Sequence, residues 1–166
     1  MYGTNVDNSP VSSTNKSEKT SDDIDVYIYG KKIEWTDAKP YINNNRTMVP
    51  LRRVAEVMDL DVEWNSNTKT AVFSGTTFYY EALGQTHCKT TVEFKLGSNK
   101  VKIQYKGIDG EIANKTITMD TSLVINNDRV YAPIRYLANA FGRDAKWNGE
   151  RRDITLEGTD FESPFE

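Results

Sequence analysis

The pattern of apolar and polar residues changes abruptly at Ile24. Residues 1–23 consist mainly of serine, threonine, asparagine, aspartate and lysine, and Val6 and Val11 are their only aliphatic side chains. Such a segment buries too little apolar surface to offset the ordering of its backbone, which costs about 1–2 kcal/mol per residue. We therefore predict a disordered linker over residues 1–23, which suggests that an export signal, a lipid anchor or another module precedes it.

Strict alternation begins at Ile24 and is typical of a half-buried β-strand. One face carries aliphatic residues and the other polar and aromatic ones: Ile24, Val26 and Ile28 against Asp25, Tyr27 and Tyr29. Gly30 predicts a turn and a returning strand, and thus a hairpin. Asparagines at residues 43–45 predict a second hairpin, because asparagine tolerates the positive φ angles of tight turns.

A short helix is predicted after the second hairpin and again near the end of the chain. Pro50 can begin the first helix, because an N–H at that place would have no partner. Apolar residues then recur every three or four positions, which gives each helix one buried stripe: Leu51, Val54, Ala55 and Met58 in the first, Ile134, Leu137, Ala138 and Phe141 in the second. A strand that ends in tryptophan, a polar turn and a last strand are predicted to follow each helix.

The two helices belong to stretches that match without a gap. Most of the stretch from Tyr41 to Phe73 recurs between Leu123 and Leu156, at an offset of 83 residues. The shared letters include four distinctive pairs: Arg46 and Arg129, Pro50 and Pro133, Arg52 and Arg135, Trp64 and Trp147. Such a register indicates an internal duplication. We predict an α+β fold of two repeated units, each an antiparallel sheet of hairpins with one short helix, packed as one domain.

Four parts are predicted along the chain: a linker at 1–23, a first repeat at 24–75, a second repeat with an insert at 76–157, and a flexible acidic tail at 158–166. Four further strands are expected between the copies: Thr76–Leu83, Thr90–Leu96, Val101–Tyr105 and Thr116–Met119. The insert from Thr76 to Cys88 matches no pattern in the other copy.

The run NRTMVPLRRVAEVMDLDVEWNSNTKTAVF, which begins at Asn45, resembles the motif of the copper amine oxidase N-terminal-like domain. The resemblance covers about Ile24 to Leu156, and the second copy departs from it at Ala132 and in the turn at residues 148–151. It implies a duplicated α+β stalk-type module of secreted and cell-surface proteins in Gram-positive bacteria. Copper catalysis in the parent enzymes uses three histidines and an Asn-Tyr motif, whereas this chain has one histidine and no Asn-Tyr pair.

Composition narrows the classes of partner. The net charge of -3 with interspersed signs argues against nucleic-acid binding. No apolar run approaches the roughly 20 residues that span a bilayer. The single cysteine, Cys88, excludes an intramolecular disulfide, and Met1 is not followed by the pattern of a signal peptide. The oligomeric state is left open.

The residues that recur in both copies are interpreted as fold requirements: Arg46, Pro50, Arg52, Trp64, Arg129, Pro133, Arg135 and Trp147. We expect Arg52 and Arg135 to brace their own hairpins through a turn carbonyl or through Asp61 and Asp144, although a pair of anion sites is an alternative. Trp64 and Trp147 are expected to lie in the core beneath the helices.

Tyr27, Tyr29 and Trp35 are the candidate ligand-binding residues, because exposed aromatic rows stack on sugar rings or anchor proteins. They could equally pack against the other half. Adjacent His87 and Cys88 would point to opposite faces of a strand, so no metal site is predicted there.

Three lysines, Lys100, Lys102 and Lys106, form an outward stripe that is typical of an edge strand, and an anionic wall-polymer site is the alternative. Neither a nucleophile elbow nor a glycine-rich phosphate loop is present, and no cofactor is predicted.

The sequence therefore favours a non-catalytic, secreted or cell-surface structural or binding module of a bacterial envelope. Its ligand would be wall polysaccharide or a protein partner. The alternative is a cell-wall glycan or peptide hydrolase with a pair of carboxylates.

Overall fold

The computed structural model describes residues 23–165, which form three β-sheets and two seven-residue helices. The predicted linker thus lies outside the described residues, except for Asp23. One antiparallel sheet has the order β10-β9-β8-β7-β6 and comprises Ile112–Thr118, Lys100–Gly107, Gly84–Lys95, Thr70–Glu81 and Asp61–Asn65. A second has the order β11-β12-β5-β4 and comprises Val124–Asn126, Arg129–Pro133, Arg46–Pro50 and Tyr41–Asn43. The third has the order β13-β14-β2-β3 and comprises Arg143–Asn148, Asp153–Gly158, Asp25–Ile28 and Lys31–Lys32.

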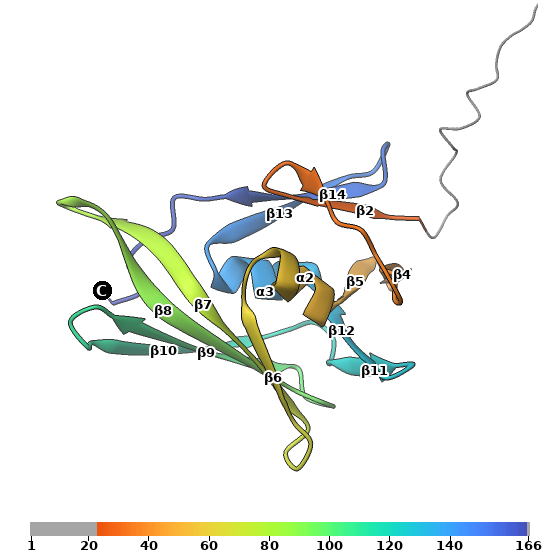
Figure 1. Cartoon of the computed structure of the whole chain (residues 1–166), viewed down its shortest axis with the longest axis horizontal. Coiled ribbons are helices and arrows are strands. Elements are labelled where there is room, and N and C mark those ends of the chain that lie inside the picture. The colour runs from red at the N-terminus through yellow and green to blue at the C-terminus, as the bar shows by residue number, and fades with distance from the viewer. Residues whose placement is uncertain (1–22, 166) are drawn as a thin grey trace, which may run out of the picture.

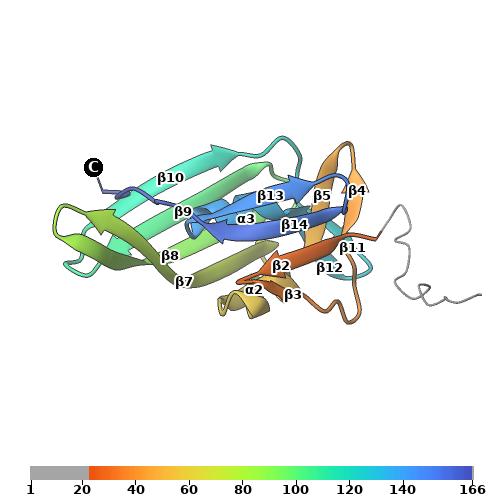
Figure 2. The same ribbon diagram turned by 90° about the horizontal axis from the view of Figure 1, so that it is seen from above.

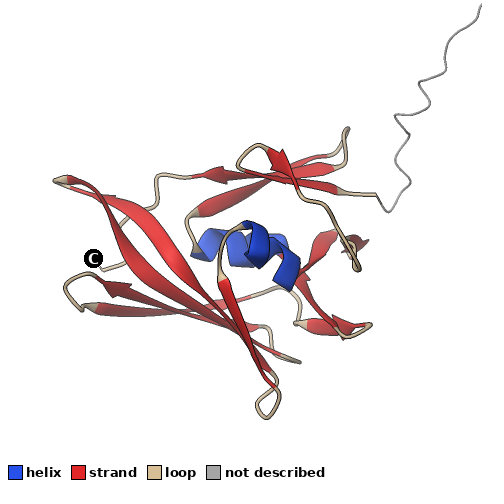
Figure 3. Ribbon diagram, viewed as in Figure 1, coloured by secondary structure: helices blue, strands red, loops and turns tan. Residues whose placement is uncertain are grey.

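Helices α2 (Leu51–Val57) and α3 (Ile134–Ala140) lie at the centre of the molecule. In Figure 1 the β13–β14–β2–β3 sheet lies above them, the five-stranded sheet below and the β4–β5–β12–β11 sheet to the right, and Figure 3 shows that strands dominate the fold. The α+β class is consistent with this mostly β architecture. In the view from above, the β7–β8 hairpin extends beyond the upper sheet (Figure 2).

The predicted apolar stripes of both helices are confirmed. Leu51, Val54 and Ala55 of α2 are fully buried, and Leu137 and Ala138 of α3 are equally inaccessible. Each helix follows a proline that serves as its N-cap with extended backbone. Because helices of seven residues are marginal on their own, the sheets around them supply their stability.

The first hairpin–helix unit and the second have matching bounds. Adding 83 to the bounds of β4, β5 and α2 gives those of β11, β12 and α3. The hairpin turns agree as well, since Asn44 and Asn45 have φ of 52° and 65°, and Asn127 and Asp128 have φ of 52° and 63°. The predicted asparagine turns therefore form as expected.

The two hairpins join edge to edge through β5 and β12. Val49 pairs with Ala132 at the middle of this antiparallel join, flanked by the pairs Met48–Pro133 and Pro50–Tyr131. Val49 and Ala132 are both fully buried. The join thus lies inside the one large hydrophobic cluster of the described residues, to which both helices and all three sheets contribute.

The strands in the middle of the chain are longer than predicted. β8 begins at Gly84 rather than at Thr90, and β10 begins at Ile112 rather than at Thr116. Residues 76–81 continue β7 from Thr70 without a break, so this strand runs through the predicted boundary between residues 75 and 76. The domain boundaries themselves stay a prediction.

Two aromatic residues of the C-terminal segment contact the core, while the flexibility of the tail stays a prediction. Phe161 packs on Tyr105 with ring centroids 5.8 Å apart, and Phe165 packs on Tyr79 at 5.9 Å. Both phenylalanines contact the core and are partly buried. The acidic residues around Phe161 and Phe165 make the segment polar on average, so its composition does not predict these two contacts. Over residues 23–165, no helix is long and apolar enough to cross a bilayer.

Candidate functional site

The three aromatic candidates from the sequence lie in different surroundings. Tyr27 is half-buried on β2 and lines a shallow depression with Arg151 and Asp153. Trp35 packs against the core, where its indole Nε1 is buried without a hydrogen-bond partner among the described residues. Tyr29 is 56% exposed and follows the end of β2 with a φ of 55°. The predicted row of aromatic residues is therefore not one surface.

Tyr29 instead meets two aromatic residues of the insert. Phe78 and Tyr80 of β7 line one cavity of about 370 Å³ together with Tyr29, and we name this cavity the aromatic cleft. Phe78 is 56% exposed and Tyr80 55% exposed. The cleft thus joins the N-terminal hairpin to the insert from Thr76 to Cys88.

Strand alternation explains why these rings face outward. Thr77 and Tyr79 of β7 are buried, so the intervening Phe78 and Tyr80 point away from the core. Both residues lie in the insert from Thr76 to Cys88, and neither was a candidate from the sequence. Their alternation with buried neighbours was the signal that could have identified them.

Polar groups border the aromatic cleft. The Arg143 guanidinium lies 4.4 Å from the centroid of the Tyr29 ring and donates a 2.9 Å hydrogen bond to its hydroxyl oxygen. Gln85 donates to the hydroxyl of Tyr80 at 3.4 Å, and Asp160 also lines the cavity. Exposed rings beside fixed donors and acceptors suit a sugar, which presents an apolar C–H face and a rim of hydroxyls.

A larger cavity of about 590 Å³ lies beside α2, and we name it the helix groove. Strands β6 and β7, the β11–β12 hairpin and residues 36–38 form its other walls. Trp64 lies at this groove and is 37% exposed, and Trp147 is 47% exposed. The prediction that both tryptophans fill the core is therefore wrong. Each lies near the end of an edge strand, β6 or β13, where neighbouring elements cover the ring on fewer sides.

The repeated arginines bind across the two halves. Arg46 of β5 binds the Asp120 carboxylate at 2.8 Å, and Arg129 of β12 binds Asp37. These acids are themselves 83 positions apart. Hydrogen bonds from Arg46 and Arg129 hold the pKa values of Asp120 and Asp37, respectively, below their usual range.

The prediction that Arg52 and Arg135 brace their own hairpins, through a turn carbonyl or through Asp61 and Asp144, is also wrong. Arg135 contacts Asp120 at 3.3 Å and the hydroxyl of Tyr136 at 2.7 Å, rather than its own hairpin or Asp144. The side chain of Arg52 is exposed and forms no hydrogen bond or ion pair with residues 23–165. Equivalent positions thus have different contacts in the two halves.

The lowered pKa values of Asp37 and Asp120 predict a pH-dependent contribution to stability. An acid with a folded pKa below its unfolded pKa stabilises the fold above the unfolded value of about 3.9, and this contribution is lost as the pH falls through the folded pKa. Replacing both Arg46 and Arg129 by glutamine should lower the melting temperature at about pH 7, and the difference from wild type should shrink toward about pH 2. Thermal melts across this range check it. Arg52→Gln is the matched control, and an equal pH dependence of that variant would contradict the role of the pairs.

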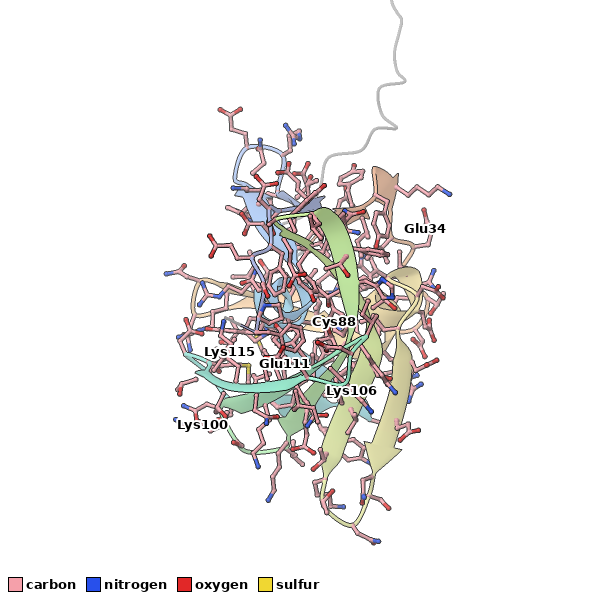
Figure 4. The ribbon with its side chains drawn as sticks, turned by 90° about the vertical axis from the view of Figure 1, so that its left-hand side faces the viewer. Glu34, Cys88, Lys100, Lys106, Glu111 and Lys115 are labelled. Atoms are coloured by element: carbon pink, nitrogen blue, oxygen red, sulfur yellow. The ribbon has the colours of Figure 1, made fainter. Side chains whose placement is uncertain are left out.

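Two other sequence predictions can be compared with the structure. Cys88 is 1% exposed and His87 is exposed on the same uninterrupted strand β8, so the pair faces opposite sides as expected. Lys100, Lys102 and Lys106 do point outward, but β9 lies between β10 and β8 and is not an edge strand. The explanation by edge protection is therefore wrong. Figure 4 labels Lys100 and Lys106, which lie at or near opposite ends of β9.

Comparison with known proteins gives one result. No curated protein and no solved structure matches the chain. The profile of the copper amine oxidase N-terminal domain matches residues 27–156, which contain both hairpin–helix units and most of the three sheets. The chain therefore belongs to the copper amine oxidase N-terminal domain family.

Proposed function

We propose that this protein is a non-catalytic binding module of a bacterial cell surface, and that the aromatic cleft holds a segment of wall polysaccharide. The family supports the first part, because the N-terminal domain of copper amine oxidases is not their catalytic part. The observation that carries the second part is the convergence of Tyr29, Phe78 and Tyr80 on one cavity. Secretion or surface display belongs to the proposal and follows from the resemblance.

The shape and lining of the aromatic cleft favour a glycan. Three exposed rings supply stacking surfaces, and each stacking contact contributes about 0.5–1.5 kcal/mol. Gln85, Arg143 and Asp160 supply the donors and acceptors that sugar hydroxyls need. Because Arg143 is held by Tyr29 in the free protein, one wall of the cleft is organised before a ligand arrives.

We also propose that the domain arose as two copies of one unit. The equal bounds of the hairpin–helix units support this, and so does the reciprocal pairing of Arg46 with Asp120 and Arg129 with Asp37. A duplicated unit explains why Arg46 and Arg129 have equivalent partners in the two halves. The three rings of the aromatic cleft, Tyr29, Phe78 and Tyr80, lie outside the repeated stretch or in the insert.

The lining of the aromatic cleft favours binding over hydrolysis. Glycoside hydrolysis uses two carboxyl groups, and Asp160 is the one carboxylate among the described residues that line the aromatic cleft. In the helix groove, Asp37 and Glu56 each pair with an arginine, whereas Glu63 and Asp128 form no ion pair within residues 23–165. Arg129 lowers the pKa of Asp37, whereas a general acid requires a raised pKa.

Co-sedimentation with purified bacterial wall sacculi tests the proposal. We expect the wild-type protein to sediment with the sacculi. Each of Tyr29→Ala, Phe78→Ala and Tyr80→Ala should weaken binding about 2- to 10-fold, and the triple variant should remain in solution. Trp64→Ala, which removes an exposed ring at the helix groove, is the control and should bind like wild type.

Two results would contradict the proposal. One is wild-type protein that stays in solution with sacculi, and the other is a folded triple variant that still sediments. Far-ultraviolet circular dichroism of each variant establishes that the domain is folded. Capture of a protein partner in place of the glycan would reassign the cleft to protein recognition.

A further inference from the structure

The helix groove is a second concave site with a lining unlike that of the aromatic cleft. Its floor contains the buried side chains of Leu51, Ala71 and Phe73. Trp64 and Ile125 stand at its rim and are 37% and 43% exposed. The helix groove therefore has an apolar floor and is accessible from solvent.

Most charged side chains of the groove neutralise one another. Arg129 pairs with Asp37, and Arg53 pairs with Glu56 and donates to the carbonyl oxygen of Glu34 at 2.8 Å. Three charged side chains of the groove, Arg52, Glu63 and Asp128, form no ion pair within residues 23–165, and Arg52 is the one cation among them. A guanidinium beside an apolar surface is suited to a carboxylate, which it can bind through two parallel hydrogen bonds.

The second half of the molecule shows what an arginine at this helix position can do. Arg135 lies 83 residues after Arg52, and its guanidinium contacts the Asp120 carboxylate at 3.3 Å. Tyr136 completes that contact, because its hydroxyl donates to Asp120 and accepts from Arg135. In the first half, Arg53 stands in place of Tyr136 and turns to Glu34 and Glu56. Asp37, the counterpart of Asp120, also lines the groove, but it binds Arg129 and not Arg52.

The groove also lies between two strand edges. β6, which carries Trp64, ends the five-stranded sheet, and β11, which carries Ile125, ends a four-stranded sheet. Outer edges of strands offer unpaired N–H and C=O groups to an extended chain, while side-chain pockets select its residues. A peptide with a carboxylate side chain can bind both Arg52 and the backbone groups at the strand edges, whereas an acidic glycan can bind only Arg52 in this way.

The structure assigns the helix groove as a docking site for an extended peptide of a partner protein that carries an aspartate or glutamate side chain between apolar residues. Arg52 binds the carboxylate, and Trp64 with Ile125 covers the apolar side chains. Glu63 and Asp128, which also line the groove, favour lysine or arginine at the ends of such a peptide over a run of acids. This site is independent of glycan binding at the aromatic cleft.

An array of blocked heptapeptides tests the assignment. Each peptide has lysine at both ends and a central aspartate between two apolar residues, and a matched array has asparagine in place of aspartate. We expect the wild-type protein to bind the best aspartate peptides at least tenfold more tightly than their asparagine counterparts, by fluorescence anisotropy. Arg52→Gln should remove this difference. Arg143→Gln, which alters an arginine of the aromatic cleft, should preserve it.

Three results would overturn the assignment. Equal affinity for aspartate and asparagine peptides would exclude the carboxylate contact. Undiminished discrimination by Arg52→Gln would place the contact elsewhere. If no peptide bound and polygalacturonate bound in a manner that required Arg52, the ligand of the groove would be an acidic glycan and not a peptide. Loss of sacculus binding in Tyr80→Ala with peptide binding intact would leave the groove assignment standing, because the two sites share no lining residue.

Discussion

Replacing Phe94 by alanine is expected to lower the free energy of unfolding by about 3–5 kcal/mol. Phe94 is fully buried in β8 and meets Phe73 of β7 edge to face, with ring centroids 5.7 Å apart. Removal of the ring leaves a cavity beneath the helices that the surrounding sheet cannot fill. Urea denaturation followed by circular dichroism measures the change.

Trp64→Ala is the informative comparison, because this larger aromatic residue is 37% exposed. Its loss should cost about 1 kcal/mol or less, as is usual for exposed positions. If Trp64→Ala instead destabilised the protein as much as Phe94→Ala, Trp64 would act as the core residue that the sequence pattern suggested.

Val49→Asp is expected to prevent stable folding at about pH 7, with a loss of more than about 3 kcal/mol. Val49 is fully buried and lies opposite Ala132 at the join of the two hairpins. A carboxylate there would lose its water without gaining a cation. Thermal melts monitored by circular dichroism give the loss.

Acid should partly rescue Val49→Asp. Burial raises the folded pKa of the introduced carboxyl above its unfolded value of about 3.9, so the destabilisation is smallest below that value and grows as the pH rises from it toward the folded pKa. Val49→Asn, which has a similar size and does not titrate, should show no such trend. A Val49→Asp variant that melts like wild type at every pH would show that the join tolerates opening.

The helices and hairpins could be predicted from the sequence because local rules determine them. The apolar stripe of α2 and the asparagines of the turns each carry a physical signal within a few residues. Because these rules use only neighbouring residues, they do not predict structure that depends on pairing between distant strands. The continuation of β7 through residue 75 depends on its pairing with β8, from Thr70–Lys95 to Glu81–Gly84, which no local pattern reveals.

The candidate sites required knowledge of which elements meet. Tyr29 was a candidate from its alternation alone, but its contact with Arg143 spans 114 positions of the chain. Arg52 and Arg135 look alike in the sequence, and only the placement of Asp120 beside Arg135 separates a bound arginine from a free one. The tryptophans show a further limit, because large apolar side chains are often partly exposed and repetition does not imply burial.

The ion pairs Arg46–Asp120 and Arg129–Asp37 link the two halves, so each half depends on the other for an acid. A polypeptide with one hairpin–helix unit would expose the edge of β5 and leave Arg46 without its acid, and both defects would be repaired by a second copy about a two-fold axis. Joining two such units in one polypeptide replaces a concentration-dependent association with an intramolecular one of high effective concentration. If the domain arose from two copies of one unit, as we propose, the tether would keep its two halves together at any dilution.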